Sequence, residues 1–90
     1  MNERNFQRKC IAAARDNGWL AYKFASPAHR GVPDCLFIKN SRVVFVEFKR
    51  PDGKGKLSKL QEHTIKDMRA HGALVYLIDN WVDFYALFIE

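Results

Sequence analysis

Apolar positions in the first half of the chain change from a helical to a strand period. In residues 3–17 they recur three or four positions apart, with Arg and Lys between them, which predicts an amphipathic helix with Asn2 as its N-cap. Residues 19–24 and 35–39 are short apolar runs, and the stretch between them is rich in Pro, Gly and Ser. Residues 42–49 form a third run after the tight Asn40-Ser41 turn. We therefore expect three strands, the last two paired as a hairpin over residues 35–49.

The second half repeats this alternation once. After the loop RPDGKGKLS, Ser58 is a suitable N-cap for a helix that runs to about Ala70, before Gly72. Residues 73–78 form a β-rich apolar run, and Asp79 and Asn80 can cap a last helix over residues 81–89. The order helix, three strands, helix, strand, helix predicts one α/β domain over residues 1–90, with helices packed on a single sheet.

Charge and composition narrow the class of protein. The chain has a formal net charge of +5 and a pI of about 9.5, which favours a polyanionic partner such as nucleic acid. No apolar run has the length of about 18 residues that a transmembrane helix needs, and the first residues are too polar for a signal peptide, so we expect a cytoplasmic protein. The distant Cys10 and Cys35 are expected to be buried free thiols, and the irregularly spaced histidines form no zinc pattern.

Three charged residues in the hairpin form the central candidate site. Glu47 and Lys49 are two positions apart on an apolar strand, so their side chains share a face. Counting from the turn places Asp34 opposite Glu47, with β-carbons roughly 5 Å apart. Two neighbouring carboxylates need a positive group between them, and Mg²⁺ is held by one or two carboxylates together with other oxygen ligands. The Phe48 carbonyl could be a further ligand, and Lys49 could contact a scissile phosphate or help deprotonate water.

Residues of two helices could extend this site. The apolar positions of the helix after Ser58 predict its buried stripe, formed by Leu57, Leu60, Thr64, Ile65 and Met68. Gln61 falls on the same stripe, where its amide needs hydrogen-bond partners such as Glu47 or Lys49. On the first helix, Glu3 or Gln7 could supply a further outer ligand, although an acidic residue in a first turn also stabilises a helix without any such role.

Basic residues gather in the two loops beside this site. His29 and Arg30 precede the second strand, and the loop after the third strand and the start of the following helix carry Arg50, Lys54, Lys56 and Lys59. We expect them to bind nucleic-acid phosphates, which gives affinity without reading sequence. A solvated charged loop is the alternative interpretation.

Together these residues resemble a known nuclease family. The ordered set Gly31-Val32-Pro33-Asp34, Glu47-Phe48-Lys49 and Gln61 is similar to the PD-(D/E)XK signature, and more narrowly to the virus-type replication-repair nuclease (VRR-NUC) domain. The similarity extends through residues 73–80, nearly to the end of the chain.

The resemblance implies a fold, an activity and roles for residues. It implies a restriction-endonuclease-like αβββαβ core with a mixed central sheet flanked by helices, followed here by a C-terminal helix. It also implies phosphodiester hydrolysis in DNA with Mg²⁺, or Mn²⁺ as a substitute. Asp34 and Glu47 would be metal ligands, Lys49 the catalytic lysine, and Gln61 an orienting residue, with Glu3 the best match to the family's first-helix acid.

The resemblance and the last helix both favour a homodimer. Stand-alone members of the family resemble homodimeric resolvases of branched DNA such as four-way (Holliday) junctions, whereas fused members act on flaps and repair intermediates. The last helix has too many apolar residues for one face: Trp81, Val82, Phe84, Tyr85, Leu87, Phe88 and Ile89. We therefore expect a second copy to cover part of it.

Two rival functions stay open at this point. A nucleic-acid-binding module of the same fold without activity, or a flap and repair-intermediate nuclease, would share most of these features. A small stand-alone nuclease would suit a phage, in which case the protein acts in the host cytoplasm.

Overall fold

The structure, a computed structural model, describes residues 1–23 and 29–90. In chain order its elements are α1 (Glu3–Asp16), β1 (Leu20–Lys23), β2 (Cys35–Lys39), β3 (Arg42–Phe48), α2 (Lys59–Ala70), β4 (Leu74–Ile78) and α3 (Trp81–Phe88). The predicted order of elements is therefore confirmed. The last position of the predicted first strand and the start of the following loop, residues 24–28, lie outside the described part of the chain.

The predicted helix caps are present. The Asn2 side chain accepts a hydrogen bond from the Asn5 N–H at 2.7 Å, and the Ser58 hydroxyl accepts one from the Gln61 N–H at 3.1 Å. Asn80 accepts from the Asp83 N–H at 2.8 Å and starts α3. Each cap satisfies one of the N–H groups that a helix start leaves without a partner inside the helix.

The four strands form one mixed sheet in the order β1-β2-β3-β4. The first two pairings are antiparallel and the third, between β3 and β4, is parallel. The polypeptide can reach β4 in parallel only through a crossover, and α2 supplies it. β3 therefore lies inside the sheet, between β2 and β4.

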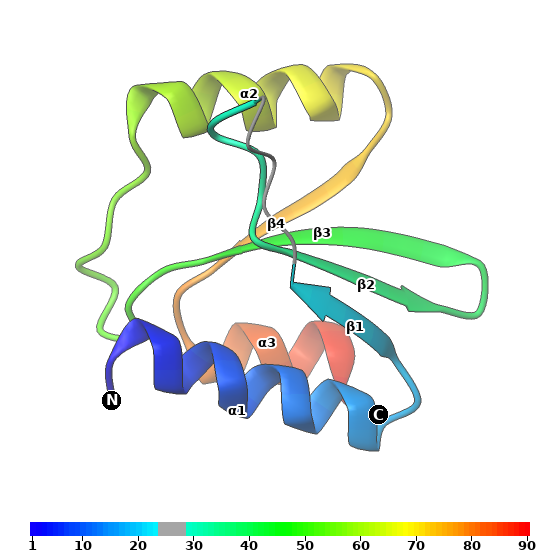
Figure 1. The fold of residues 1–90 in the computed structure, drawn as a ribbon. Helices are drawn as coiled ribbons and strands as arrows, with labels where there is room; N and C mark the ends of the chain where they lie inside the picture. The colour runs from blue at the N-terminus through cyan, green and yellow to red at the C-terminus, as the bar shows by residue number, and fades with distance from the viewer. Residues whose placement is uncertain (24–28) are drawn as a thin grey trace.

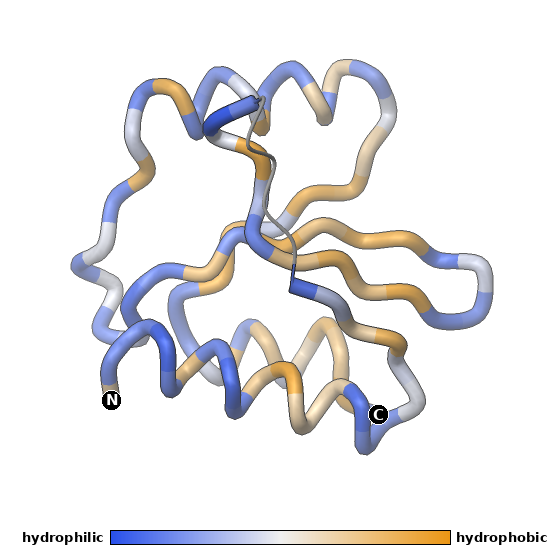
Figure 2. Tube along the Cα trace, in the orientation of Figure 1, coloured by the Kyte–Doolittle hydropathy of each residue, from blue (hydrophilic) through white to orange (hydrophobic). Residues whose placement is uncertain are grey.

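The helices divide between the two faces of the sheet (Figure 1), with α1 and α3 on one face and α2 on the other. Figure 2 shows apolar residues along β2, β3 and β4 and polar residues over much of α2 and the loop before it. The core lies between the sheet and the α1–α3 layer, and its largest fully buried side chains include Phe6, Phe37, Phe48, Phe84 and Phe88. Their rings meet mainly edge-on or tilted, as between Phe6 and Phe48, whose centroids are 6.0 Å apart.

The predicted buried stripe of α2 is wrong in part. Only Ile65 is buried in this helix, and Leu60 is 48% exposed. The reason is that α2 leaves an open pocket between itself and β3, so Leu60 and Met68 line that pocket instead of filling a core. β4 is likewise only half buried, with Leu74 and Leu77 exposed, because it is an edge strand.

The core of this chain covers most of the apolar surface of α3. The number of apolar residues in this helix therefore no longer argues for a second copy. Phe84 and Phe88 are buried in the core, and Trp81, Leu87 and Ile89 pack against it. Val82 and Tyr85 are the large apolar side chains of α3 that stay exposed. The helix lies beside α1 and beneath the sheet (Figure 1), and these two neighbours cover most of its apolar side chains. None of the helices in the described part of the chain has the length and apolar character that crossing a bilayer requires.

Candidate active site

The hairpin register brings Asp34 and Glu47 together, as predicted. Cys35 pairs with Val46, so the next position outward on each strand sets Asp34 opposite Glu47. The Asp34 Oδ2 atom accepts a hydrogen bond from the Phe48 N–H at 3.3 Å, which ties this carboxylate to the end of β3. Alternation along the strand sends Phe48 into the core and Glu47 to the opposite face.

The Gly31-Val32-Pro33-Asp34 segment brings Asp34 to this position by packing against α2. Gly31 has φ +86°, and a β-carbon there would lie 2.8 Å from the Thr64 hydroxyl and 2.9 Å from the Leu60 carbonyl oxygen. Only glycine allows both the left-handed backbone and this close approach. Pro33 is fully buried, so the segment is fixed immediately before Asp34.

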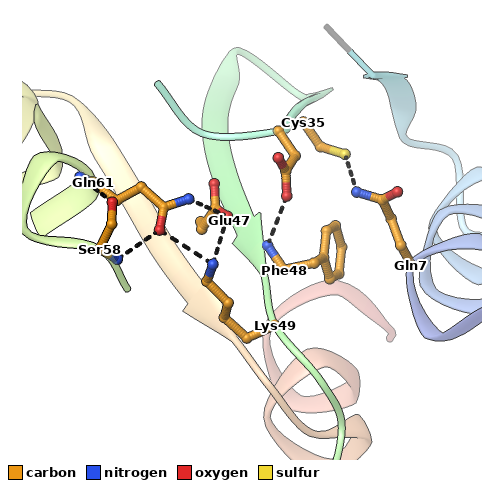
Figure 3. A network of polar contacts seen from close by, with 8 residues as sticks. Gln7, Cys35, Glu47, Phe48, Lys49, Ser58 and Gln61 are labelled. Carbon is orange, nitrogen blue, oxygen red and sulfur yellow. Dashed lines mark hydrogen bonds and ion pairs between the residues drawn. The ribbon is translucent and has the colours of Figure 1, made fainter. Parts of the chain in front are cut away.

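Lys49 and Gln61 close a polar network around Glu47 (Figure 3). The Lys49 Nζ atom lies 3.6 Å from Glu47 Oε2, and Gln61 Nε2 donates to the same oxygen at 3.1 Å. The Gln61 Oε1 atom accepts from Lys49 Nζ at 3.2 Å and from the Ser58 N–H at 2.9 Å. Lys49 Nζ and the Ser58 N–H are donors and the Glu47 carboxylate is an acceptor, so the orientation of the Gln61 amide is determined. Gln61 therefore holds the lysine and the carboxylate in one arrangement. The predicted partners of Gln61 are confirmed, although its helix stripe is more open than expected.

Glu47 is an ionisable group that is buried where its charged form is unfavourable. Its side chain is 3% exposed, and burial together with the nearby Asp34 carboxylate raises the pKa of Glu47 to about 7, against the opposing effect of Lys49. Within the described residues, Glu47 Oε1 is a buried oxygen with no hydrogen-bond partner. A buried carboxylate oxygen without a donor destabilises the ionised form, so the site lacks one positive or donating group.

A divalent cation fits this donor set. The Glu47 Oε1 atom needs a positive partner, Asp34 supplies a second hard oxygen beside it, and the Phe48 carbonyl belongs to the same strand end. Among the residues that the structure describes, no group of three or more His, Cys, Asp and Glu side chains could hold a metal ion. Two carboxylates with further oxygen ligands are a set that suits Mg²⁺, whereas structural Zn²⁺ sites use four protein ligands.

The first helix reaches the same site from the other side. A cavity of about 250 Å³ is lined by Glu3, Arg4, Gln7, Lys23 and Asp34. Glu3 is exposed at the start of α1, whereas Gln7 is buried and donates from Nε2 to the Cys35 sulfur at 3.5 Å. Both candidate first-helix residues therefore line the cavity that contains Asp34, and the geometry does not choose between them.

The predicted phosphate-binding residues occupy two separate places. His29 lines the pocket under α2, and the Arg30 carbonyl accepts a weak hydrogen bond from the Thr64 hydroxyl at 3.5 Å. Arg50 forms an ion pair with Asp52 at 2.6 Å, which the sequence argument did not foresee and which neutralises part of that loop.

The remaining lysines of this set, Lys54, Lys56 and Lys59, are exposed. Gly55 packs over the base of Lys49, since a β-carbon there would lie 3.1 Å from Lys49 Cβ. The loop with Lys54 and Lys56 therefore stays against the candidate site.

Sequence reasoning missed two features of the site. Gln61 completes a capping box with Ser58, which the Ser-x-x-Gln spacing could have indicated. Lys23 lines the Asp34 cavity from β1, and only the strand pairing brings it there. Cys10 and Cys35 are buried and free, as predicted, and burial raises the pKa of each thiol to about 12.

The fold and the site together define a class of protein, a small α/β domain with two carboxylates, a lysine and a glutamine at the end of a central strand. No protein-family model matches the chain. Over 76 residues, 83% of this chain and 82% of the relative, it is 36% identical to "Putative nuclease p44" of Acyrthosiphon pisum secondary endosymbiont phage 1. Among solved structures it is similar to a chain described as "VRR_NUC domain", with a TM-score of 0.84 and 23% identity over 94% of this chain and 91% of that one.

The chain belongs to the family of this phage relative, and its fold is that of the VRR-NUC domain. The family and the fold that the signature residues implied are thereby confirmed.

Proposed function

We propose that this chain is a Mg²⁺-dependent endonuclease that hydrolyses phosphodiester bonds in DNA, with Mn²⁺ as a substitute cation. The observation that carries the proposal is the buried, unpartnered Glu47 Oε1 beside Asp34, with Lys49 held at the same strand end. The name and 36% identity of the phage relative support the nuclease class, and the net charge of +5 supports a polyanionic substrate.

Each residue of the site has a separate task in this proposal. Asp34, Glu47 and the Phe48 carbonyl would hold the cation, which when bound supplies Lewis acidity at the phosphate and lowers the pKa of the attacking water. Lys49 places a positive charge where negative charge grows on the scissile phosphate or takes part in deprotonating water. Gln61 positions Lys49 and Glu47 through its two hydrogen bonds. Glu3 or Gln7 would act as an outer ligand from the cavity beside Asp34.

The basic side chains would bind the DNA backbone around the cut. His29 and Arg30 lie on one side of the site, and on the other the structure exposes Arg50, Lys54, Lys56 and Lys59. The sequence contains no base-reading motif, so selection by DNA shape is favoured over selection by sequence.

Branched DNA, such as a four-way junction, is the proposed substrate, and a homodimer is the proposed active form. A two-fold dimer carries two sites and suits cuts on two strands. The support within the chain now comes from Leu20, Tyr22 and Val43, which lie on the α2 side of the sheet, where this helix leaves them exposed. Light scattering at micromolar concentration tests the dimer, and a monomer mass would contradict it. Cytoplasmic action, in the host cell if a phage encodes the protein, stays a prediction.

One panel of reactions tests this function. Labelled four-way junction, flap, duplex and single-stranded DNA are incubated with Mg²⁺, Mn²⁺ or EDTA, using the wild type and Lys49→Ala. We expect metal-dependent cuts in the junction that Lys49→Ala reduces by several orders of magnitude. Binding without cleavage on every substrate would favour an inactive binding module, and preferred cutting of the flap would favour a repair-intermediate nuclease. Cleavage that survives Lys49→Ala would contradict the assigned site.

A further inference from the structure

A pocket of about 560 Å³ lies beside the candidate active site, between α2, β3 and the segment before β2. Its apolar lining consists of Val32, Phe45, Leu60 and Met68, and His63 and Asp67 are among its polar residues. This volume is within the range of about 300–1,000 Å³ that is typical of small-ligand sites. The sequence predicted that Leu60 and Met68 would fill a core, so the pocket is a feature that only the packing of α2 creates.

The pocket and the candidate site share three segments. Phe45 lies two residues before Glu47 on β3, so both side chains are on the same face, about 6.7 Å apart along the strand. Val32 lies two residues before Asp34, and Leu60 directly precedes Gln61. A nucleotide whose phosphate lies at the carboxylates therefore has its base within reach of this pocket.

We propose that the pocket takes an unpaired nucleobase of the DNA next to the scissile phosphate, an inference that rests on the proposed function. A base has an apolar face that stacks on an aromatic ring, and Phe45 with Leu60 and Met68 supplies such a surface. Base edges need hydrogen-bond partners, and His63 and Asp67 lie on the pocket lining from successive turns of α2.

The charge around the pocket suits this occupant. Arg30 and Lys59 are exposed immediately beside pocket residues in sequence, and His29 and His71 also line the pocket. The basic Arg30 and Lys59 beside an apolar interior match a nucleotide, which has an apolar base and an anionic phosphate. An unpaired base enters at lower cost than a paired one, because no base pair has to break. Such a pocket would favour branched or frayed DNA over intact duplex.

The test uses a four-way junction with 2-aminopurine placed in turn at each nucleotide of the crossover. With Ca²⁺ in place of Mg²⁺, we expect wild-type protein to raise the fluorescence at the nucleotide next to the mapped cut, because that base leaves its stack. Phe45→Leu keeps an apolar side chain but removes the ring, and we expect it to weaken junction binding about five- to tenfold and to remove the fluorescence rise. Circular dichroism verifies that this variant is folded.

The matched control is Tyr85→Leu, which removes an exposed aromatic ring from α3, outside the pocket and the candidate site. It should leave the fluorescence rise in place. A junction with an abasic site at the same nucleotide needs no variant, and wild-type protein should bind it as weakly as Phe45→Leu binds the intact junction.

Two outcomes overturn the pocket assignment, and neither depends on the nuclease assignment. Cleavage without any fluorescence rise would leave the nuclease and exclude the base pocket. A change in oligomeric mass for Phe45→Leu with unchanged DNA binding would assign the pocket to a second copy of this chain. A fluorescence rise without cleavage in Mg²⁺ would instead support the base pocket and contradict the nuclease.

Discussion

The two faces of the sheet differ in how completely they are covered. On the face toward α1 and α3, Phe37, Val44, Val46 and Phe48 are buried without residual exposure. On the face toward α2, Val43 is 46% exposed and a pocket stays open beside Phe45. The first face is closed to solvent like a protein interior, whereas the second has the mixture of apolar wall and polar groups that ligand sites show.

This difference separates stability from chemistry within a single strand. Glu47 and Phe48 are neighbours in sequence, but one joins the charged site and the other joins the aromatic core. The buried neighbour holds the strand in place, so the charged residue has a fixed position without contributing to the core. Substitutions on the two faces should therefore separate into losses of activity and losses of stability.

The largest expected effect is on the α2 face, from Asp34→Asn. The amide oxygen can still accept the hydrogen bond from the Phe48 N–H, but the negative charge that would hold a cation is lost. We expect DNA cleavage to fall about a thousandfold with almost no loss of thermal stability. Initial rates and thermal unfolding measure the two quantities, and Asp16→Asn, exposed at the end of α1, is the control for lost charge. Equal rates for Asp34→Asn and wild type would remove Asp34 from the site.

The next effect is on the packed face, from Phe37→Ala. This ring is fully buried between Trp19, Phe48, Phe84 and Phe88. Its removal should lower the free energy of unfolding by about 3–5 kcal/mol, a large part of the total for a small domain. Urea unfolding followed by circular dichroism measures the loss. A loss below about 1 kcal/mol would mean that this face is not the main source of stability.

A smaller effect is expected for Gln61→Ala, because this residue acts through others. Without the amide, Lys49 and Glu47 keep their ion pair but lose the hydrogen bonds that position them. We expect kcat to fall about 10- to 100-fold, with KM for DNA nearly unchanged. Glu62→Ala, the exposed neighbour on the same helix, should leave both constants unaltered. A change confined to KM would indicate DNA contact instead of positioning.

The smallest effect is a pH dependence of stability without metal. The pKa of Glu47 is raised to about 7, above its ordinary value of 4.5, so the folded protein binds this proton more tightly than the unfolded chain. The contribution is fully present below pH 4.5 and is lost as the pH rises through about 7. In EDTA, wild type should therefore lose stability between pH 5 and 7.5 relative to Glu47→Gln, which cannot ionise. Chemical unfolding of both proteins across this range tests the sign, and a wild type that gains stability relative to the variant would contradict it.

Much of the fold follows from local patterns in the chain. The helix caps at Asn2 and Ser58, the turn at Asn40-Ser41 and the strand runs all depend on neighbouring residues, and each is found where it was predicted. The hairpin register is also local, because counting from the turn was enough to place Asp34 opposite Glu47. The site could be predicted to this extent because a two-residue period and a short turn leave few alternatives.

Other parts of the site depend on contacts between distant segments. The parallel pairing of β4 with β3 and the position of α2 over the sheet decide that Gln61 meets Glu47 and Lys49. The same packing decides that Leu60 lines a pocket, although its spacing indicated a buried stripe. Packing also decided that the apolar residues of α3 join the core of this chain. Helical periodicity shows that a helix face is apolar, but it does not show which surface covers that face.

The sequence by itself determined the order of elements, the caps and the pairing of the two carboxylates, because these arise from interactions between residues close in the chain. Only the tertiary structure decided how far each face of the sheet is covered, because that depends on where α2 and α3 pack. The buried Glu47 oxygen without a partner and the pocket beside Phe45 both follow from that packing.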